Sequence, residues 1–198
     1  MTNILVLYYS NNGATESLAR QVCTGVDSIE NAAAVLRTVP SVSTVCESTE
    51  KLIPSNGPPY VNKKDLANCS GLIMGSPTYF GNMAAPLKYF LDSTSSEWLS
   101  GVLAGKPAGF FTSSSSSHGG QESTLLSMAI PLLHHGMIIV GIPYTLKEIS
   151  TTKSGGGPYG ASHITWNRDN EELTNEEKKV AQAVGKRVTQ IAKKLILK

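Results

Sequence analysis

The sequence predicts an α/β fold in which a five-stranded parallel sheet carries helices on both faces. Two observations predict it: apolar, strand-like runs recur at roughly even intervals, and helix-like stretches separate them. This alternation is typical of βαβ units. The first run is continuous Ile, Leu, Val and Tyr, as expected of a parallel strand buried on both faces. The five predicted strands cover residues 4–9, 33–39, 71–74, 108–111 and 137–142.

Helices are predicted where apolar residues recur three and four positions apart, because this spacing places them on one face. After the first strand these residues are Leu18, Ala19, Val22 and Val26. After the third strand a second set follows Pro86, which suits a first helical turn, and consists of Leu87, Phe90 and Leu91, with an end near Asp92. A further helix is expected over 121–135.

The last predicted helix has the clearest signals. Thr174 and Glu177 have the spacing of a capping box, in which each side chain bonds the backbone N–H of the other residue. A single apolar line then runs to the end of the chain through Val180, Val184, Val188, Ile191 and Leu195. We expect the lysines and the arginine of this helix to form a solvated face.

The chain of 198 residues suits a single domain over 1–198, with long loops at about 40–64 and 143–170. Loops of this length usually serve as lids, interface elements or disordered segments. The second loop carries a glycine-rich run beside Tyr159 and His163. This run could be a connection without a function of its own, or it could form a lid or a subunit contact. Both interpretations remain open.

Composition excludes several classes of protein. Charged residues make up 16% and the net charge is +2, so no nucleic acid or other polyanion partner is indicated. No apolar stretch reaches the ~18 residues of a membrane span, and no basic leader precedes the first strand, so we expect a cytoplasmic protein. Cys23, Cys46 and Cys69 lack CxxC spacing, which indicates reduced thiols and no metal site.

The loop after the first strand, at 10–15, has the features of an anion site. Free backbone N–H groups and the positive end of a helix dipole meet where such a strand turns into a helix. The loop lacks both the Gly-Lys-Ser/Thr of a nucleotide P-loop and the GxGxxG of dinucleotide folds. A single phosphate held by Ser10, Asn12, Thr15 and amides fits best, which points to FMN. An ordinary Asn-Gly turn is the alternative.

Two further strand ends would complete a flavin site, because ligands of open parallel sheets bind beyond the carboxyl ends of the strands. The turn at 75–83 presents Thr78, Tyr79 and Phe80 as a wall for the ring. The polar loop at 112–120 offers amide donors to the pyrimidine edge. The alternative for this serine run is a low-complexity linker. His134 and His135 could simply end a helix, and adjacent helical residues point too far apart to share a metal.

Six segments, in the right order along the chain, together resemble the WrbA family. They are Leu-Tyr-Tyr-Ser at 7–10, Gly-Ser-Pro-Thr-Tyr-Phe-Gly-Asn-Met at 75–83, Leu-Lys-Tyr-Phe-Leu-Asp at 87–92, His-Gly-Gly-Gln-Glu at 118–122, Leu-His-His-Gly-Met at 133–137 and Gly-Pro-Tyr-Gly-Ala at 157–161. Members are flavodoxin-like FMN proteins with NAD(P)H:quinone oxidoreductase activity, historically called Trp-repressor-binding proteins. The resemblance implies a flavodoxin-like doubly wound sheet of strand order 2-1-3-4-5.

The resemblance also implies roles for individual residues. The first loop would hold the phosphate, the turn after the third strand would bound the ring, and the serine-rich loop would meet the polar edge. His134 would approach FMN and, with Trp98 lent across a subunit interface, would line the substrate side. The implied cofactor-binding residues are Ser10, Asn11, Asn12, Gly13, Ala14, Thr15, Pro77, Thr78, Tyr79, Phe80, Gly81, Asn82, Thr112, Ser113, Ser114, Ser115, Ser116, Ser117, His118, Gly119 and His134.

The implied function is FMN-dependent quinone reduction by a ping-pong mechanism, in which NAD(P)H gives a hydride to the flavin and a quinone then takes two electrons. A homodimer or homotetramer is implied as well. Asn12 stands where many members have Tyr, and Tyr79 replaces a usual Arg, which leaves the choice between NADH and NADPH open.

Two alternatives remain. One is a flavodoxin-type electron carrier, a class that is usually strongly acidic, whereas this chain has a pI near 8.4. The other is a regulatory flavoprotein that binds another protein without catalysis.

Overall fold

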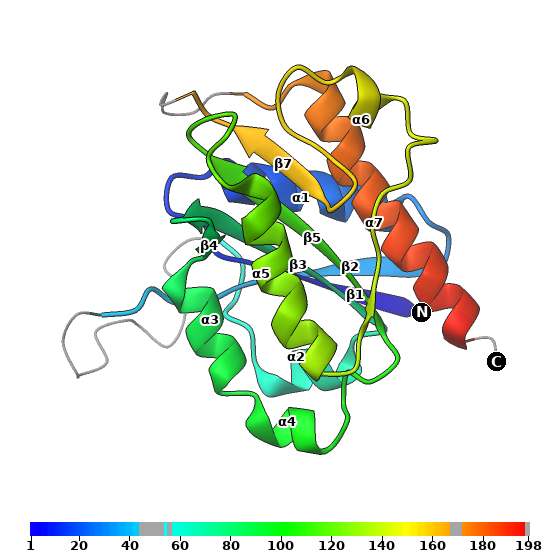
Figure 1. Ribbon diagram of the computed structural model, residues 1–198. Coiled ribbons are helices and arrows are strands. Elements are labelled where there is room, and N and C mark those ends of the chain that lie inside the picture. The colour runs from blue at the N-terminus through cyan, green and yellow to red at the C-terminus, as the bar shows by residue number, and fades with distance from the viewer. Residues whose placement is uncertain (44–53, 55–56, 167–171, 197–198) are drawn as a thin grey trace.

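The computed structural model describes residues 1–43, 54, 57–166 and 172–196 and contains the predicted parallel sheet (Figure 1). Its strand order is β2-β1-β3-β5-β6, which is the predicted 2-1-3-4-5 order once the short β4 is set aside. All neighbours along this path are parallel. The strands are β1 (Thr2–Tyr8), β2 (Ala32–Thr38), β3 (Gly71–Tyr79), β5 (Pro107–Ser114) and β6 (Ile138–Ile139). The flavodoxin-like fold class is confirmed.

The fifth strand position differs from the prediction, because two short strands share it. β6 pairs with Pro107 and Ala108 at the start of β5, and β7 (Ala161–Ile164) pairs with Phe111–Ser114 at its end. The predicted strand over 137–142 is therefore too long, and the predicted loop over 143–170 contains both β7 and α6 (Glu148–Thr151). Pro143 has no N–H to continue the ladder, and the N–H of Ile142 already bonds Pro158 O.

The loop predicted at about 40–64 lies largely outside the described residues. Its last part is structured: Tyr60 forms a parallel bridge with Thr38, and α2 (Lys63–Asn68) begins inside the predicted loop. Asn62 caps α2 and forms a capping box with Asp65.

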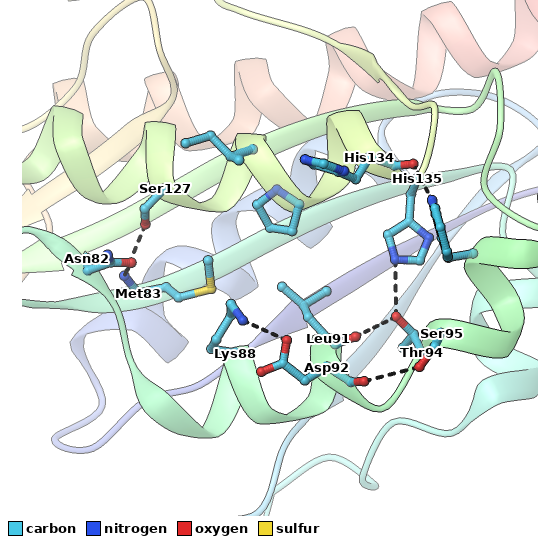
Figure 2. A pocket seen from close by; sticks show the side chains of 13 residues that line it. Asn82, Met83, Lys88, Leu91, Asp92, Thr94, Ser95, Ser127, His134 and His135 are labelled. Atoms are coloured by element: carbon cyan, nitrogen blue, oxygen red, sulfur yellow. Dashed lines mark hydrogen bonds and ion pairs between the residues drawn. The ribbon is translucent and has the colours of Figure 1, made fainter.

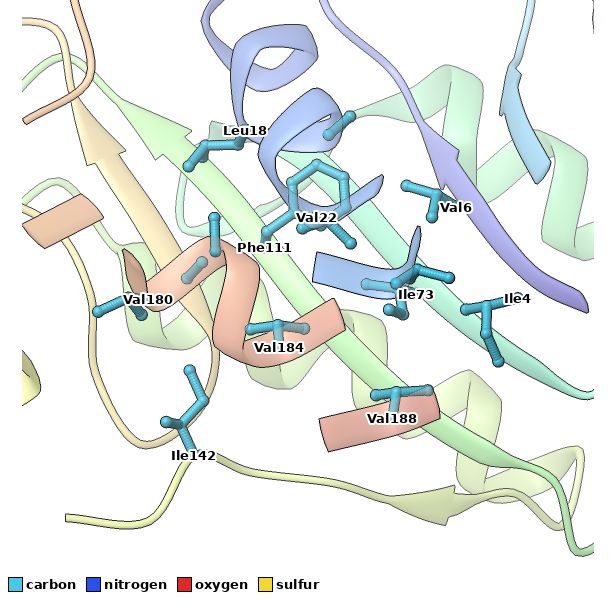
Figure 3. Close-up of a cluster of buried hydrophobic side chains, with 14 of the residues drawn as sticks. Ile4, Val6, Leu18, Val22, Ile73, Phe111, Ile142, Val180, Val184 and Val188 are labelled. Atoms are coloured by element: carbon cyan, nitrogen blue, oxygen red, sulfur yellow. The ribbon is translucent and has the colours of Figure 1, made fainter. Parts of the chain in front are cut away.

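Two helical layers cover the sheet. α1 (Ala14–Asp27) and α7 (Asn175–Ile196) pack on one face, where Ile4, Val6 and Tyr8 of β1 point (Figure 3). α2, α3 (Ala85–Asp92) and α5 (Gln121–His134) pack on the other, against Leu5 and Leu7. Because alternate residues of β1 enter two different cores, its run is apolar throughout.

The helix predictions are confirmed with small corrections. The four predicted apolar residues of α1 are all buried, and α3 ends at Asp92 as expected. α5 ends at His134, one residue early, and Phe90 is only partly buried. The apolar line of α7 is buried as far as Val188, after which Leu195 is 39% exposed. None of the described helices combines the length and the apolarity needed to cross a membrane.

The described cysteines pack as small side chains. Cys23 is partly buried, Cys69 is buried and both are free thiols, while Cys46 lies outside the described residues. Burial raises the pKa of Cys23 to about 12 and also raises the pKa of Cys69. Neither thiol is therefore ionised at neutral pH.

Candidate functional site

A cavity of about 280 Å³ lies beyond the carboxyl ends of β1, β3 and β5. In a doubly wound sheet this edge is where ligands bind. The described residues that line the cavity are Ser10, Asn11, Asn12, Ala14, Thr15, Pro77, Thr78, Tyr79, Ser113, Ser114, Ser115 and Thr165. Eleven of these were predicted from the sequence, and the fold brings their three loops to one place.

The loop after β1 folds over itself to start α1. Ser10 Oγ accepts a hydrogen bond from Gly13 N at 3.1 Å. Gly13 is the N-cap and has a φ of 86°, in the left-handed region where a glycine is unstrained. No side chain caps α1. The backbone N–H groups of the first turn, at Ala14 and Thr15, are therefore available to a ligand at the positive end of the helix.

Hydroxyl groups connect the three loops. Thr15 Oγ1 lies 2.8 Å from Ser113 Oγ, which joins the first turn of α1 to the end of β5. Thr78 Oγ1 lies 3.3 Å from Thr112 Oγ1 and accepts from Thr124 Oγ1 at 3.2 Å, so β3 is held to β5 and to α5. The cavity wall is consequently a preformed set of neutral donors and acceptors.

The chemistry of this wall fits the phosphate of FMN. None of the described residues that line the cavity carries a formal charge, so hydroxyls, amides and the α1 dipole supply the attraction for an anion. A carboxylate in the wall would repel a phosphate, and none of the lining residues provides one.

Thr165 also lines the cavity and was not among the predicted site residues. It follows β7, and its N–H donates to Ser114 O at 2.9 Å. No pattern in the sequence predicts this position, because β7 is a four-residue strand, Ala-Ser-His-Ile, without an apolar run.

Eight more predicted cofactor residues belong to the same three strand-end segments without lining the cavity. Phe80 and Gly81, both at positive φ, form the turn between β3 and β4 (Asn82–Met83), and Phe80 is fully exposed. Ser116, Ser117 and His118 are exposed, in the loop that leads to α5. The other members of this group are Thr112, Gly119 and Gly13, and Gly13 is hydrogen-bonded to Ser10.

A second cavity, of about 510 Å³, lies between α3, α4 (Ser95–Leu99) and α5 (Figure 2). Trp98 and His134 both line it, and Trp98 Nε1 donates to His134 O at 2.7 Å. Asn82 lines this cavity and not the first. The described residues at this cavity are Asn82, Met83, Lys88, Leu91, Asp92, Thr94, Ser95, Trp98, Ser127, Ile130, Pro131, His134 and His135.

His135 is the more firmly held of the two histidines. Thr94 Oγ1 donates to Leu91 O at 2.6 Å and lies 3.1 Å from His135 Nε2, which therefore donates to it. Burial lowers the pKa of His135, so its imidazole is neutral at pH 7. The two histidines lie at a helix end, as predicted. Their rings have different surroundings.

His134 does not line the first cavity of its own chain. α5 starts at Gln121, whose side chain donates to Ser116 O, and runs for 14 residues, which carries His134 roughly 20 Å away from Gln121. Trp98 shares the second cavity with His134 and likewise does not line the first. The predicted contacts of these two residues with cofactor and substrate stay predictions.

The fold and the first cavity agree with the sequence comparisons. Residues 2–149 match the family model of NADPH-dependent FMN reductases. The chain belongs to this family. Two curated relatives are both described as NAD(P)H dehydrogenase (quinone): one from Syntrophobacter fumaroxidans is 41% identical over 97% of this chain and 98% of its own, and one from Geobacter sulfurreducens is 40% identical over 98% of each.

Solved structures show the same fold at lower identity. A WrbA-like flavodoxin from Agrobacterium tumefaciens has a TM-score of 0.67 at 22% identity, over 98% of this chain and 99% of its own. Oxidised flavodoxin 2 from Bacillus cereus has a TM-score of 0.58 at 16% identity, over 98% and 99%. These likenesses show that the chain has a flavodoxin-like fold.

Proposed function

We propose that this protein is an FMN-dependent NAD(P)H:quinone oxidoreductase of the WrbA type. The observation that carries the proposal is the neutral, hydroxyl-lined cavity at the carboxyl ends of β1, β3 and β5, in a chain about 40% identical to two NAD(P)H dehydrogenases (quinone). FMN is the cofactor, NAD(P)H is the donor and a quinone is the acceptor.

The residues at the cavity divide the task of holding FMN. Ser10, Thr15 and the first N–H groups of α1 bind the phosphate, because they are neutral donors at the positive end of a helix. Thr78 and Tyr79 bound the ring from β3, and the loop 113–119 lies along its polar edge. Bound FMN would supply the redox chemistry, a two-electron relay from NAD(P)H to a quinone, while these side chains position it and exclude water.

We propose further that the active form is a homo-oligomer. The outer face of α5 exposes Leu126, Ile130 and Leu133, which recur at helical spacing and are 48%, 59% and 58% exposed. An apolar stripe of this kind is typical of an interface. A second copy against it would bring Trp98 and His134 to the cofactor of its neighbour. The free Cys23 and Cys69 support a reducing, cytoplasmic location.

Titration of purified apoprotein with FMN tests the cofactor, since binding quenches flavin fluorescence and gives a yellow protein. Steady oxidation of NADH or NADPH with benzoquinone, without any added reductase, then separates the enzyme from a flavodoxin-type carrier. Gel filtration of the same sample gives the size of the oligomer. Protein that stays colourless in excess FMN would overturn the proposal.

A further inference from the structure

A buried carboxylate lies behind the wall of the FMN cavity. Glu177, in the first turn of α7, has no solvent-exposed surface, yet it accepts five hydrogen bonds. The donors are Thr174 N (2.8 Å) and His163 Nδ1 (2.9 Å) to Oε2, and Ser154 Oγ (2.7 Å), Gly155 N (3.0 Å) and Ile164 N (3.4 Å) to Oε1. A capping box requires only the hydrogen bond from Thr174 to Glu177, so the other four hydrogen bonds have another role.

The charge of this carboxylate is set by its donors. Burial alone would raise the pKa of Glu177, but the hydrogen bonds from His163, Ser154 and Thr174 outweigh burial and lower the pKa to about 2. Glu177 is therefore ionised at neutral pH and can only accept. It follows that His163 Nδ1 carries a hydrogen atom and donates a hydrogen bond to Glu177.

His163 is an unexpected residue for a purely structural strand. Its side chain is 1% exposed, and its second nitrogen, Nε2, has no hydrogen-bond partner among the described residues. A buried polar atom without a partner costs free energy that an apolar side chain would not. The hydrogen bond from Nδ1 to Glu177 offsets part of this cost.

The donors of Glu177 include two consecutive residues of β7. This strand has four residues and, among the described strands, only β5 as its neighbour, so its pairing alone fixes it weakly. His163 and Ile164 bond to Glu177, and His163 is in register with Ser113. The carboxylate thus connects α7 to β7 directly beside the end of β5 that lines the cavity.

The next residue along the chain enters the cavity. Thr165 follows Ile164, donates its N–H to Ser114 O and lines the cavity together with Ser113 and Ser114. Ser113 in turn is bonded to Thr15 of the phosphate loop. A displacement of β7 would accordingly move Thr165 and disturb the wall that it forms with Ser113 and Ser114.

We propose that Glu177 and His163 are a pair of positioning residues for the FMN site: the buried carboxylate holds β7 against β5 and so fixes Thr165, Ser113 and Ser114 at the cavity. The inference rests on the proposed function, because it assigns these residues a role toward FMN. Neither residue contacts the cavity, and both act through β7.

Three full-length variants test this role by fluorescence titration with FMN, at a temperature where each is fully folded. His163→Ala should bind FMN about tenfold more weakly, because a hydrogen bond to a buried charge is lost. His163→Asn, whose amide nitrogen can take the place of Nδ1, should recover most of this loss. Ser154→Ala removes one donor from the other oxygen and should weaken binding about threefold.

Hydrogen exchange gives a readout besides ligand binding. In His163→Ala the amides of 161–165 should exchange faster, whereas those of β1 and β3 should keep the protection seen in the unchanged protein. Val188→Ala is the matched control: this buried residue of α7 packs near Gly109, far along β5 from the cavity, so it should lower the melting temperature without changing FMN affinity.

The outcomes separate the two proposals. If the unchanged protein does not bind FMN, the proposed function fails and the inference fails with it. If the unchanged protein binds FMN and His163→Ala binds equally well, only the inference is overturned. Equal loss of affinity in His163→Ala and Val188→Ala would also overturn it, since the pair would then act through general stability alone.

Discussion

The two cavities differ in how they are built. The first is formed by loops that directly follow β1, β3 and β5, and its wall is neutral and rich in hydroxyls. The second is formed by α3, α4 and α5 and contains an indole and two imidazoles. The first has neutral donors from three loops of one chain, as the proposed phosphate site needs. The second has aromatic groups near the exposed apolar stripe of α5, where we propose that another copy binds.

This difference assigns separate tasks to the two regions. Changes at the strand ends should affect FMN binding, whereas changes among the helices should affect the quinone and the assembly. A change in one region that altered the other region's function would contradict this assignment.

The largest effect is expected from a charge placed in the neutral cavity. Asn12 is exposed and lines the cavity in the loop that is proposed to hold the phosphate, so Asn12→Asp, which has nearly the same shape as asparagine, should fold normally. Repulsion between the new carboxylate and the phosphate should weaken FMN binding about a hundredfold. Fluorescence titration measures the effect, and Asn12→Ser, which carries no charge, is the control. Similar affinities for both variants would show that the phosphate binds elsewhere.

A smaller effect is expected from the hydroxyl that joins two of the loops. Thr15→Val keeps the shape of the side chain but removes the bond to Ser113, and should weaken FMN binding about tenfold. Thr15→Ser should bind almost normally because it keeps the hydroxyl. The same titration compares them, with the exposed α1 variant Thr24→Ala as a control for changes in the helix.

The second cavity should respond in a different measurement. Trp98→Ala should raise the quinone KM about fivefold, the loss expected when an aromatic contact is removed, while FMN affinity stays within twofold. Steady-state kinetics with benzoquinone and FMN titration of the same sample measure the two quantities. Equal losses in both would remove Trp98 from the substrate side.

The last prediction concerns how the stability of the fold depends on pH, and it follows from Glu177. Its pKa is about 2 in the folded protein against an ordinary 4.5, so the unfolded chain binds more protons between these values. This contribution to stability is full above pH 4.5 and is lost as the pH falls toward 2. Chemical denaturation at several pH values should show a shallower decline in Glu177→Gln than in the unchanged protein. An identical pH profile for the two would mean that another group controls acid stability.

Local signals in the sequence predicted much of the first cavity. The run at 4–9 predicts a buried strand and the polar residues at 10–15 follow it directly, so strand and loop are contiguous in the chain. The same holds for the loops after β3 and β5. By contrast, Thr165 was missed, and the sequence did not predict that His134 lies at a second cavity with Trp98. Both residues have neighbours that come from distant segments of the chain.

Short-range patterns in the chain predicted the alternation of strands and helices, the capping box of Thr174 and Glu177, and the hydroxyl-rich loops at the strand ends, because each of these features depends on neighbouring residues. Long-range packing places β6 and β7 at one position in the sheet, brings Glu177 to His163, and brings Trp98 to His134. These arrangements depend on how helices and strands pack across the sheet, and packing joins residues whose separation along the chain carries no periodic signal.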